Sequence, residues 1–437
     1  MKLILRNINK NRLDYGIYGI AVMLAVSILY IFNSIIFSED IKKILNEYED
    51  VNGIFYGATI LVIFVIMIFI WYSNKFFINK RKKEIGIFSL VGMENNKIAN
   101  MIFGENLLIG IVAAIGGTIL GIFLSKYFTK LYSYILGASY GNSHIIFDLK
   151  AIVITNAIFF VFYFLVCLNS SSIIEKYQLI DLFKGNNMCE AAFKKTIIKG
   201  LPGVVVIAIG YMTYPWAIMT LGLSVLLTLL LVIKGTYKLF RTKVIERIID
   251  EKDRTGFEDG INLVSTSNLL FRIRSNARIL STVSILIAST ITSVGICAAL
   301  YFSYDSSSGV ALLSNIFFIG ICISVIFTIC TISILLFKFI QEAHDEAPRY
   351  KILSQIGFTR IDIKKIITKQ LSFVYIVPLI IGVIHSLAAL SITVLSMNHK
   401  YAVAILIIYG MYTLIYFIYF RITRRIYISI ILKNITN

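Results

Sequence analysis

The sequence predicts an all-α membrane protein of about ten transmembrane helices. Apolar residues make up 58% of its 437 residues and the mean hydropathy is +0.82, whereas soluble domains are roughly 45–50% apolar. A membrane-spanning helix needs about 20 predominantly apolar residues, and runs of this kind recur along the whole chain. The ten runs cover residues 16–37, 54–73, 106–125, 151–170, 197–213, 216–233, 280–304, 311–337, 371–397 and 401–420.

The runs differ in how clearly they predict a span. The first is too long for the apolar core of a signal peptide, so it is expected to be a retained helix. The fifth, which precedes the Tyr214-Pro215 turn, is the shortest.

Cysteines occur singly, without a Cys-x-x-Cys pair or histidines at ligand spacing. The sequence therefore indicates neither a disulfide framework nor a metal site.

Positive charge predicts the orientation in the membrane. With the N-terminus inside, all but six of the 42 Lys and Arg residues fall on the cytoplasmic side, which is the positive-inside asymmetry. The six on the outer side are Lys42, Lys43, Lys126, Lys130, Lys150 and Lys400. Both termini are therefore expected in the cytoplasm. The net charge of +18 is spread over several loops and both ends, so no nucleic-acid partner is expected.

Three basic segments are expected to contact membrane lipid. Residues 1–10 carry Lys and Arg on one helix face and isoleucines on the other, and the tail 421–434 has a similar composition. The cluster 80–83, Lys-Arg-Lys-Lys, is expected to set topology and to touch anionic lipid.

A repeat divides the chain. The segment KEIGIFSLVGMENNKIANMIFGENLLIG from Lys83 aligns without gaps to PRYKILSQIGFTRIDIKKIITKQLSFVY, which starts 265 positions later at Pro348. The same offset carries the second span onto the eighth and the third onto the ninth. We therefore expect five segments: 1–53 with an interfacial helix, the first span and an outer loop; 54–170 as the first repeat; 171–310 with three spans and a cytoplasmic linker; 311–420 as the second repeat; and 421–437 as a cytoplasmic tail.

Each copy of the repeat predicts a descending span, a turn, a short amphipathic cytoplasmic helix and an ascending span. Gly92 and Gly357 suit the left-handed or tight conformation that such a turn needs. After each glycine, three apolar residues share one helix face at spacing i, i+3, i+4. These trios are Ile98, Met101 and Ile102, and Ile363, Ile366 and Ile367. Two interpretations stay open: helices seated at the lipid headgroups, or two equivalent contacts for a two-fold soluble partner.

Several activities lack the residues they need. No G-x-x-x-x-G-K-[ST] phosphate loop occurs, so the chain is expected not to be an enzyme and to bind no cofactor itself. The spans contain no Asp, Glu or Arg, which argues against an ion-coupled carrier. His385, the one imidazole at depth, is expected to make interhelical hydrogen bonds. Glu105, whose repeat counterpart is Gln370, is interpreted as a favourable charge at a helix N-terminus, with cooperation from residues 80–83 left open.

The segment RKKEIGIFSLVGMENNKIANMIFGENLLIG resembles the signature of FtsX-like (MacB/LolC-type) ABC permeases. The start RNINKNRLDYGIYGIAVMLAVSILYIF, the ten spans and the later PRYKILSQIGFTRIDIKKIITKQLSFVYIVPLIIGVIHS resemble the bacitracin-export, BceB-like branch. The resemblance implies a multi-pass permease of the bacterial cell membrane. It also implies a separate cytoplasmic ABC ATPase dimer that binds ATP, with coupling contacts at 93–103 and 358–369. The site residues expected to couple to the ATPase are Gly92, Ile98, Met101, Ile102, Glu105, Gly357, Ile363, Ile366 and Ile367.

One departure from that branch limits what the resemblance implies. Its members carry a large extracellular domain between the seventh and eighth spans, whereas only 302–309, FSYDSSSG, joins them here. The chain is therefore expected to take part in export of, or resistance to, peptide antibiotics or related amphiphiles at the outer surface. The identity of the substrate stays open. A second permease subunit or a sensor histidine kinase as partner stays open. The alternatives are a scaffold that regulates such a kinase, or an ion-coupled carrier.

Overall fold

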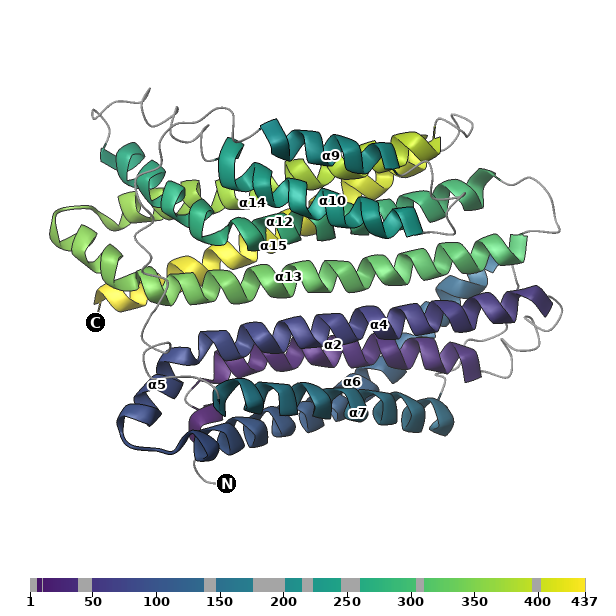
Figure 1. Cartoon of the computed structure of the whole chain (residues 1–437), viewed down its shortest axis with the longest axis horizontal. Helices are drawn as coiled ribbons and strands as arrows, with labels where there is room; N and C mark the ends of the chain where they lie inside the picture. Colours follow the sequence, from purple (N-terminus) through teal and green to yellow (C-terminus); the bar gives the residue numbers. More distant parts are fainter. Residues whose placement is uncertain are drawn as a thin grey trace. The chain divides into compact units, whose positions relative to one another are not determined.

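The computed structural model describes residues 6–9, 11–37, 49–136, 147–175, 201–213, 223–244, 260–303, 310–394 and 402–436. These residues form helices and short turns, with no strand among them, so the predicted all-α class is confirmed (Figure 1). The helices are α2 (Arg12–Phe37), α4 (Glu49–Lys80), α5 (Lys82–Leu90), α6 (Asn95–Leu136), α7 (Leu149–Glu175), α9 (Leu201–Thr213), α10 (Leu223–Leu239), η3 (Phe240–Val244), α12 (Gly260–Ser303), α13 (Val310–Gln355), α14 (Arg360–Val394) and α15 (Ala402–Thr436). The predicted turn at Tyr214-Pro215 and most of the loop 302–309 lie outside the described residues.

Each of the ten apolar runs overlaps one of these helices. Among the described residues, seven helices are long and apolar enough to cross a membrane. The apolar stretches Val62–Lys75 of α4 and Gly203–Thr213 of α9 are shorter. The chain is therefore a multi-pass membrane protein, while the number of ten spans stays a prediction.

The chain divides into two compact units. Unit 1 contains Met1–Asn187 and Leu300–Ser333, and unit 2 contains Met188–Ala299 and Ile334–Asn437. Helix α13 supplies residues to both units. The five segments expected from the repeat stay a prediction.

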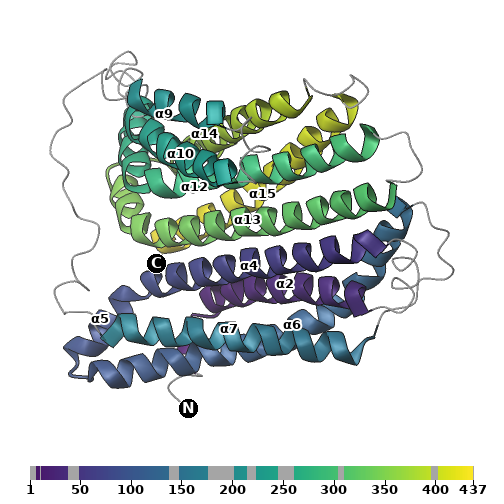
Figure 2. The same cartoon turned by 45° about the vertical axis from the view of Figure 1, so that its right-hand side comes forward.

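In unit 1, α2 packs against α4, α6 and α7, and α2 and α4 run side by side in both views (Figures 1 and 2). The contact between α2 and α6 is close because α6 presents glycine there: a Cβ on Gly117 would lie 2.6 Å from the Met23 carbonyl oxygen. Small residues allow membrane helices to approach in this way. In unit 2, α9 and α10 pair side by side (Figure 2).

The outer surfaces of α6 and α14 carry matching apolar ridges. Ile111, Ile115 and Ile119 are exposed on α6. Residues at the +265 offset, Ile376, Ile380 and Ile384, are exposed on α14. Exposed isoleucines every four residues form one helix face, which is the face that lipid covers in a membrane protein. The repeat thus extends from the turns into the membrane-facing surface.

The structure corrects the expected short helices. The predicted amphipathic helix and the ascending span form one continuous helix in each copy, α6 and α14. Helix α6 also continues to Leu136, past Lys126 and Lys130, which are expected on the outer side, and α15 continues through most of the expected tail. Continuous helices satisfy backbone hydrogen bonds internally, which lipid requires, and these segments contain no proline that would end them at the predicted boundaries.

Candidate functional site

The first turn joins α5 to α6 and is closed by backbone hydrogen bonds around Gly92. The Gly92 amide donates to the Ser89 carbonyl at 3.1 Å, and the Met93 amide donates to the Phe88 carbonyl at 3.0 Å. These two bonds form a Schellman motif, whose glycine takes a left-handed conformation. Gly92 has φ +91°, so the conformation predicted for this glycine is confirmed.

The second turn repeats this geometry between α13 and α14. The Gly357 amide donates to the Ser354 carbonyl at 3.3 Å, and the Phe358 amide donates to the Leu353 carbonyl at 3.1 Å. Gly357 has φ +105°. Its α14 also begins with a capping box, in which the Thr359 amide donates to the Asp362 carboxylate at 3.0 Å. The alignment of the two copies is thus matched by the same turn in three dimensions.

The apolar trios are buried, although they were expected to contact a partner. Ile98, Met101 and Ile102 are buried in a cluster with Ile78 and Ile85, to which Phe88 and Met93 add contacts. The side chains of Ile363, Ile366 and Ile367 are fully buried as well. A shared helix face at i, i+3, i+4 identifies neighbours on the helix, but it does not say whether the face meets a partner or the chain itself. The prediction that these side chains are presented to a partner is therefore corrected.

The sequence interpretation missed four exposed aliphatic residues. Ile87 and Val91 precede Gly92 and are 55% and 82% exposed. Their counterparts at the +265 offset, Ile352 and Ile356, are 58% and 67% exposed. Each pair is spaced i, i+4 and so lies on one helix face. The gap-free alignment contained this signal, because Ile87 and Ile352 match within it.

Glu105 lies at the centre of a buried polar network in unit 1. It is fully buried and forms a salt bridge with Arg81. The Tyr15 hydroxyl and the Asn7 side-chain amide each donate to its carboxylate at 2.8 Å. Arg81 also lies 5.1 Å from the Tyr15 ring centre and 3.2 Å from the Glu84 carboxylate. The cooperation with residues 80–83 is confirmed for Arg81, whereas the helix N-terminus interpretation is wrong, because α6 begins ten residues earlier at Asn95.

Burial lowers the pKa of Arg81, but Tyr15 and the carboxylates of Glu105 and Glu84 outweigh it and raise that pKa above its usual value. The guanidinium therefore stays charged, as a buried arginine must be paired to be tolerated. The pair attaches the start of α2 and the end of α4 to α6. Figure 1 shows α5 at the end of unit 1 where α2 begins, and Asn11 of the preceding turn donates to Glu84 of α5 at 2.7 Å.

Unit 2 contains a corresponding network in which the arginine lies at a different position of the repeat. Arg272 of α12 is buried and pairs with Glu346 at 2.8 Å and with Glu342 at 3.3 Å, both on α13. Its guanidinium also donates to the Tyr427 hydroxyl and lies 5.1 Å from that ring centre. At the +265 offset, Arg272 corresponds to Asn7 and Glu346 corresponds to Arg81. The position is thus ionic in both copies, but the arginine comes from a different helix.

His385 makes the interhelical hydrogen bonds that its position predicted. In unit 2, its Nδ1 contacts the Tyr211 hydroxyl of α9, and its Nε2 lies 2.9 Å from the Thr236 hydroxyl of α10. No group of three or more possible metal ligands occurs in the part of the chain that the structure describes. The four described cysteines, Cys167, Cys297, Cys322 and Cys330, are free.

Comparison with known proteins identifies the region around the first turn. Residues 56–179, which include Gly92, Arg81 and Glu105, match the family described as FtsX-like permease C-terminal. The chain contains an FtsX-like permease domain. This domain extends from within α4 to the end of α7, so the match covers the first copy of the repeat.

Alignments with curated relatives extend the similarity beyond this domain. The chain is 29% identical over 323 residues to the bacitracin export permease protein BceB of Bacillus subtilis, covering 71% of this chain and 49% of the relative. BceB of Halalkalibacterium halodurans is 27% identical with the same coverage. The uncharacterized ABC transporter permease YvcS of Bacillus subtilis is 28% identical, covering 68% of this chain and 46% of the relative.

These comparisons confirm the resemblance to BceB-like permeases of the FtsX family. The chain spans about half the length of the curated relatives it matches. The relatives are named as permeases, which agrees with the expectation that this FtsX-like chain is not an enzyme.

We predict that Gly92→Ala and Gly357→Ala each destabilise the protein. A Cβ meets no atom within 4 Å at either position, so the cost comes from the positive φ alone and should be about 1–3 kcal/mol. The matched control is Gly410→Ala, where a Cβ also meets open space but the glycine is helical. The measurement is thermal unfolding in detergent; an unchanged midpoint in Gly92→Ala would contradict the turn geometry.

We also predict that Arg81→Met destabilises unit 1 by about 3–5 kcal/mol, because it leaves the Glu105 carboxylate buried without its cation. Adding Glu105→Gln removes the second charge and should restore part of the stability. Glu94→Gln is the control, since its partner Lys97 lies 3.3 Å away and both side chains are mostly exposed; surface pairs contribute about 0–1 kcal/mol. Denaturant unfolding of the three variants checks this order. A double variant with a lower free energy of unfolding than Arg81→Met would refute it.

Proposed function

We propose that this chain is the permease subunit of an ATP-binding cassette complex, and that a separate cytoplasmic ATPase dimer docks on the two glycine turns. The observation that carries the proposal is the pair of exposed aliphatic residues before each glycine: Ile87 with Val91, and Ile352 with Ile356. Two matching apolar contacts suit a partner that presents the same surface twice.

The chemistry of the turns supports a protein partner. Fully burying a valine or isoleucine contributes roughly 1.5–3 kcal/mol, and these four side chains are more than half exposed. Charged residues surround them: Glu94 and Lys97 are exposed at the first turn, and Lys351 and Arg360 at the second. An apolar centre within a polar rim is the usual arrangement of a protein interface.

The buried residues of the proposed coupling site have a supporting role. The trio Ile98, Met101 and Ile102 holds α5 against the first turns of α6, and the Arg81–Glu105 pair joins the same region to α2. A displacement of the turn would therefore move α6 with it. The ATP that drives such a displacement is bound by the partner, and this chain binds no cofactor.

The names of the relatives support a proposal for the substrate class. Because two of them are named bacitracin export permeases, we extend export of, or resistance to, peptide antibiotics and related amphiphiles to this chain. A scaffold for a sensor kinase and a second permease subunit are alternatives that no observation favours. An ion-coupled carrier has less support, because His385 is held by two hydrogen bonds within the chain.

We predict that Val91→Asp combined with Ile356→Asp abolishes copurification of the partner ABC ATPase, which is first identified by pull-down with the unmodified chain. The added carboxylates would have to be buried at the interface without partners, which is costly. Ile98→Asp and Ile363→Asp are unsuitable because those residues are buried and the changes would disrupt folding. The measurement is pull-down of the ATPase, followed by its ATP hydrolysis rate in the reconstituted complex.

The matched control is Asn96→Asp, which adds a carboxylate to an exposed residue at the start of α6 and should leave the ATPase bound. Full retention of the ATPase by the double aspartate variant would refute docking on the turns. Resistance that persists after a mutation blocks ATP hydrolysis would favour the kinase scaffold, and gradient-driven uptake by the chain alone in liposomes would favour the carrier.

A further inference from the structure

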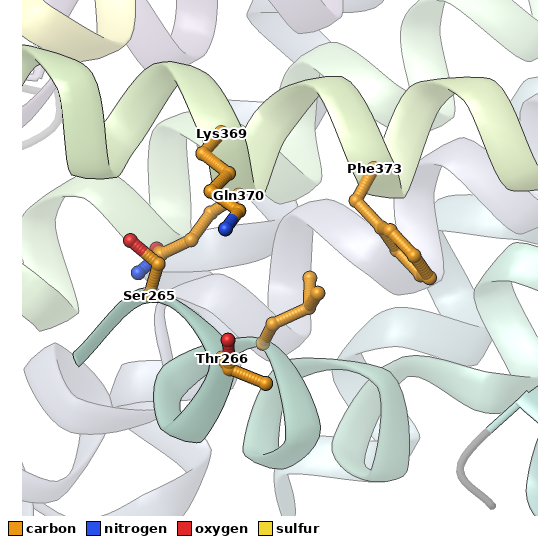
Figure 3. Close-up of a pocket in the computed structure, with 6 residues that line it drawn as sticks. Ser265, Thr266, Lys369, Gln370 and Phe373 are labelled. Atoms are coloured by element: carbon orange, nitrogen blue, oxygen red, sulfur yellow. The ribbon is translucent and has the colours of Figure 1, made fainter. Parts of the chain in front are cut away.

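A small cavity lies within unit 2 between α12 and α14. It is lined by Ser265, Thr266, Leu269, Lys369, Gln370 and Phe373. Figure 3 shows the side chains of Lys369 and Gln370 extending from α14 toward Ser265 and Thr266 of α12. Its volume is about 40 Å³, and a single water needs about 10–15 Å³. The cavity therefore has room for more than one water or for the oxygens of a small anionic group.

Gln370 gives this cavity an unused donor. The side chain is fully buried, and its Oε1 accepts a hydrogen bond from the Tyr350 hydroxyl at 3.1 Å. This bond orients the amide, and the Nε2 atom is left without a hydrogen-bond partner. A buried polar group without a partner is costly, so the position favours an acceptor that the protein does not itself supply.

The counterpart position in unit 1 shows what is different here. Glu105 occupies it, and its carboxylate accepts from three donors of the same chain, Arg81, Tyr15 and Asn7. At Gln370 the polarity is reversed, because the residue presents a donor. Among the described residues that line the cavity, none carries a carboxylate, while one ammonium and two hydroxyl groups are present.

We propose that this cavity binds a phosphate group. A phosphate oxygen accepts hydrogen bonds from amide and hydroxyl donors, and the Lys369 ammonium would neutralise its charge. Lys369 is the last Lys, Arg, Asp or Glu of α14 before its apolar run, so the cavity lies at the depth where lipid headgroups meet acyl chains. Leu269 and Phe373 supply apolar surface beside the polar groups. The phosphate comes either from a phospholipid headgroup, as in basic pockets between membrane helices, or from solution.

The site is independent of the ATPase and can be tested on the purified full chain in neutral detergent. The probes are dioleoyl phosphatidylglycerol, dioleoylglycerol, which lacks the phosphate, and inorganic phosphate. The expected result is that phosphatidylglycerol is retained in native mass spectra and raises the thermal midpoint, whereas dioleoylglycerol does neither. Lys369→Gln and Thr266→Val should each weaken phosphatidylglycerol binding by about tenfold, the usual effect of losing one charge-assisted hydrogen bond.

Lys364→Gln is the matched control, since Lys364 is exposed on α14 away from the cavity; it should bind as the unmodified chain does. Displacement of the lipid by millimolar inorganic phosphate would assign the site to soluble phosphate, and resistance to displacement would assign it to the headgroup. Equal phosphatidylglycerol binding by Lys369→Gln, Thr266→Val and Lys364→Gln, with unchanged thermal midpoints in all three, would overturn the proposal and leave a cavity filled by water.

Discussion

Two buried arginines need charged and polar partners inside this protein, and the surrounding helices supply them. A guanidinium in the interior is tolerated only when carboxylates and hydroxyls surround it, and Arg81 and Arg272 both have such partners. Each arginine also lies 5.1 Å from a tyrosine ring centre. Because the partners come from different helices, the first network joins α2 to α6. The second joins α12 to α13 and α15. In the chain, Gly92 lies between Arg81 and Glu105, and Gly357 follows Glu346.

The sequence predicted the features that depend on local rules. Apolar runs identified the helices, since a bilayer imposes length and composition, and the conformations of Gly92 and Gly357 followed from what ends a helix. Features that depend on distant contacts were not predictable. Spacing placed Ile98, Met101 and Ile102 on one face but could not reveal that α5 and the end of α4 cover it. The partners of Arg272 lie at positions 342, 346 and 427, and no local pattern connects them.

The helices that follow the turns are long and continuous. Helix α6 has 42 residues, which at 1.5 Å per residue corresponds to roughly 60 Å, more than the thickness of a bilayer. Within it, buried Glu105 and the close contact of Gly117 with α2 lie on the same element. A load applied at the turn would therefore be carried by a stiff element with lateral support along its length, and no separate joint is needed between the turn and the membrane.

Because the arginine lies at a different position in each network, the two copies cannot exchange these residues freely. Placing the segment that precedes α2 on the second copy would set Asn7 beside Glu346 and leave that carboxylate without its arginine. The reciprocal exchange would set Arg272 beside Arg81. The first hybrid would bury a carboxylate without its arginine, and the second would place two arginines where one now pairs with Glu105 and Glu84. The two copies are therefore not interchangeable at these positions, and they differ again at Glu105 and its counterpart Gln370.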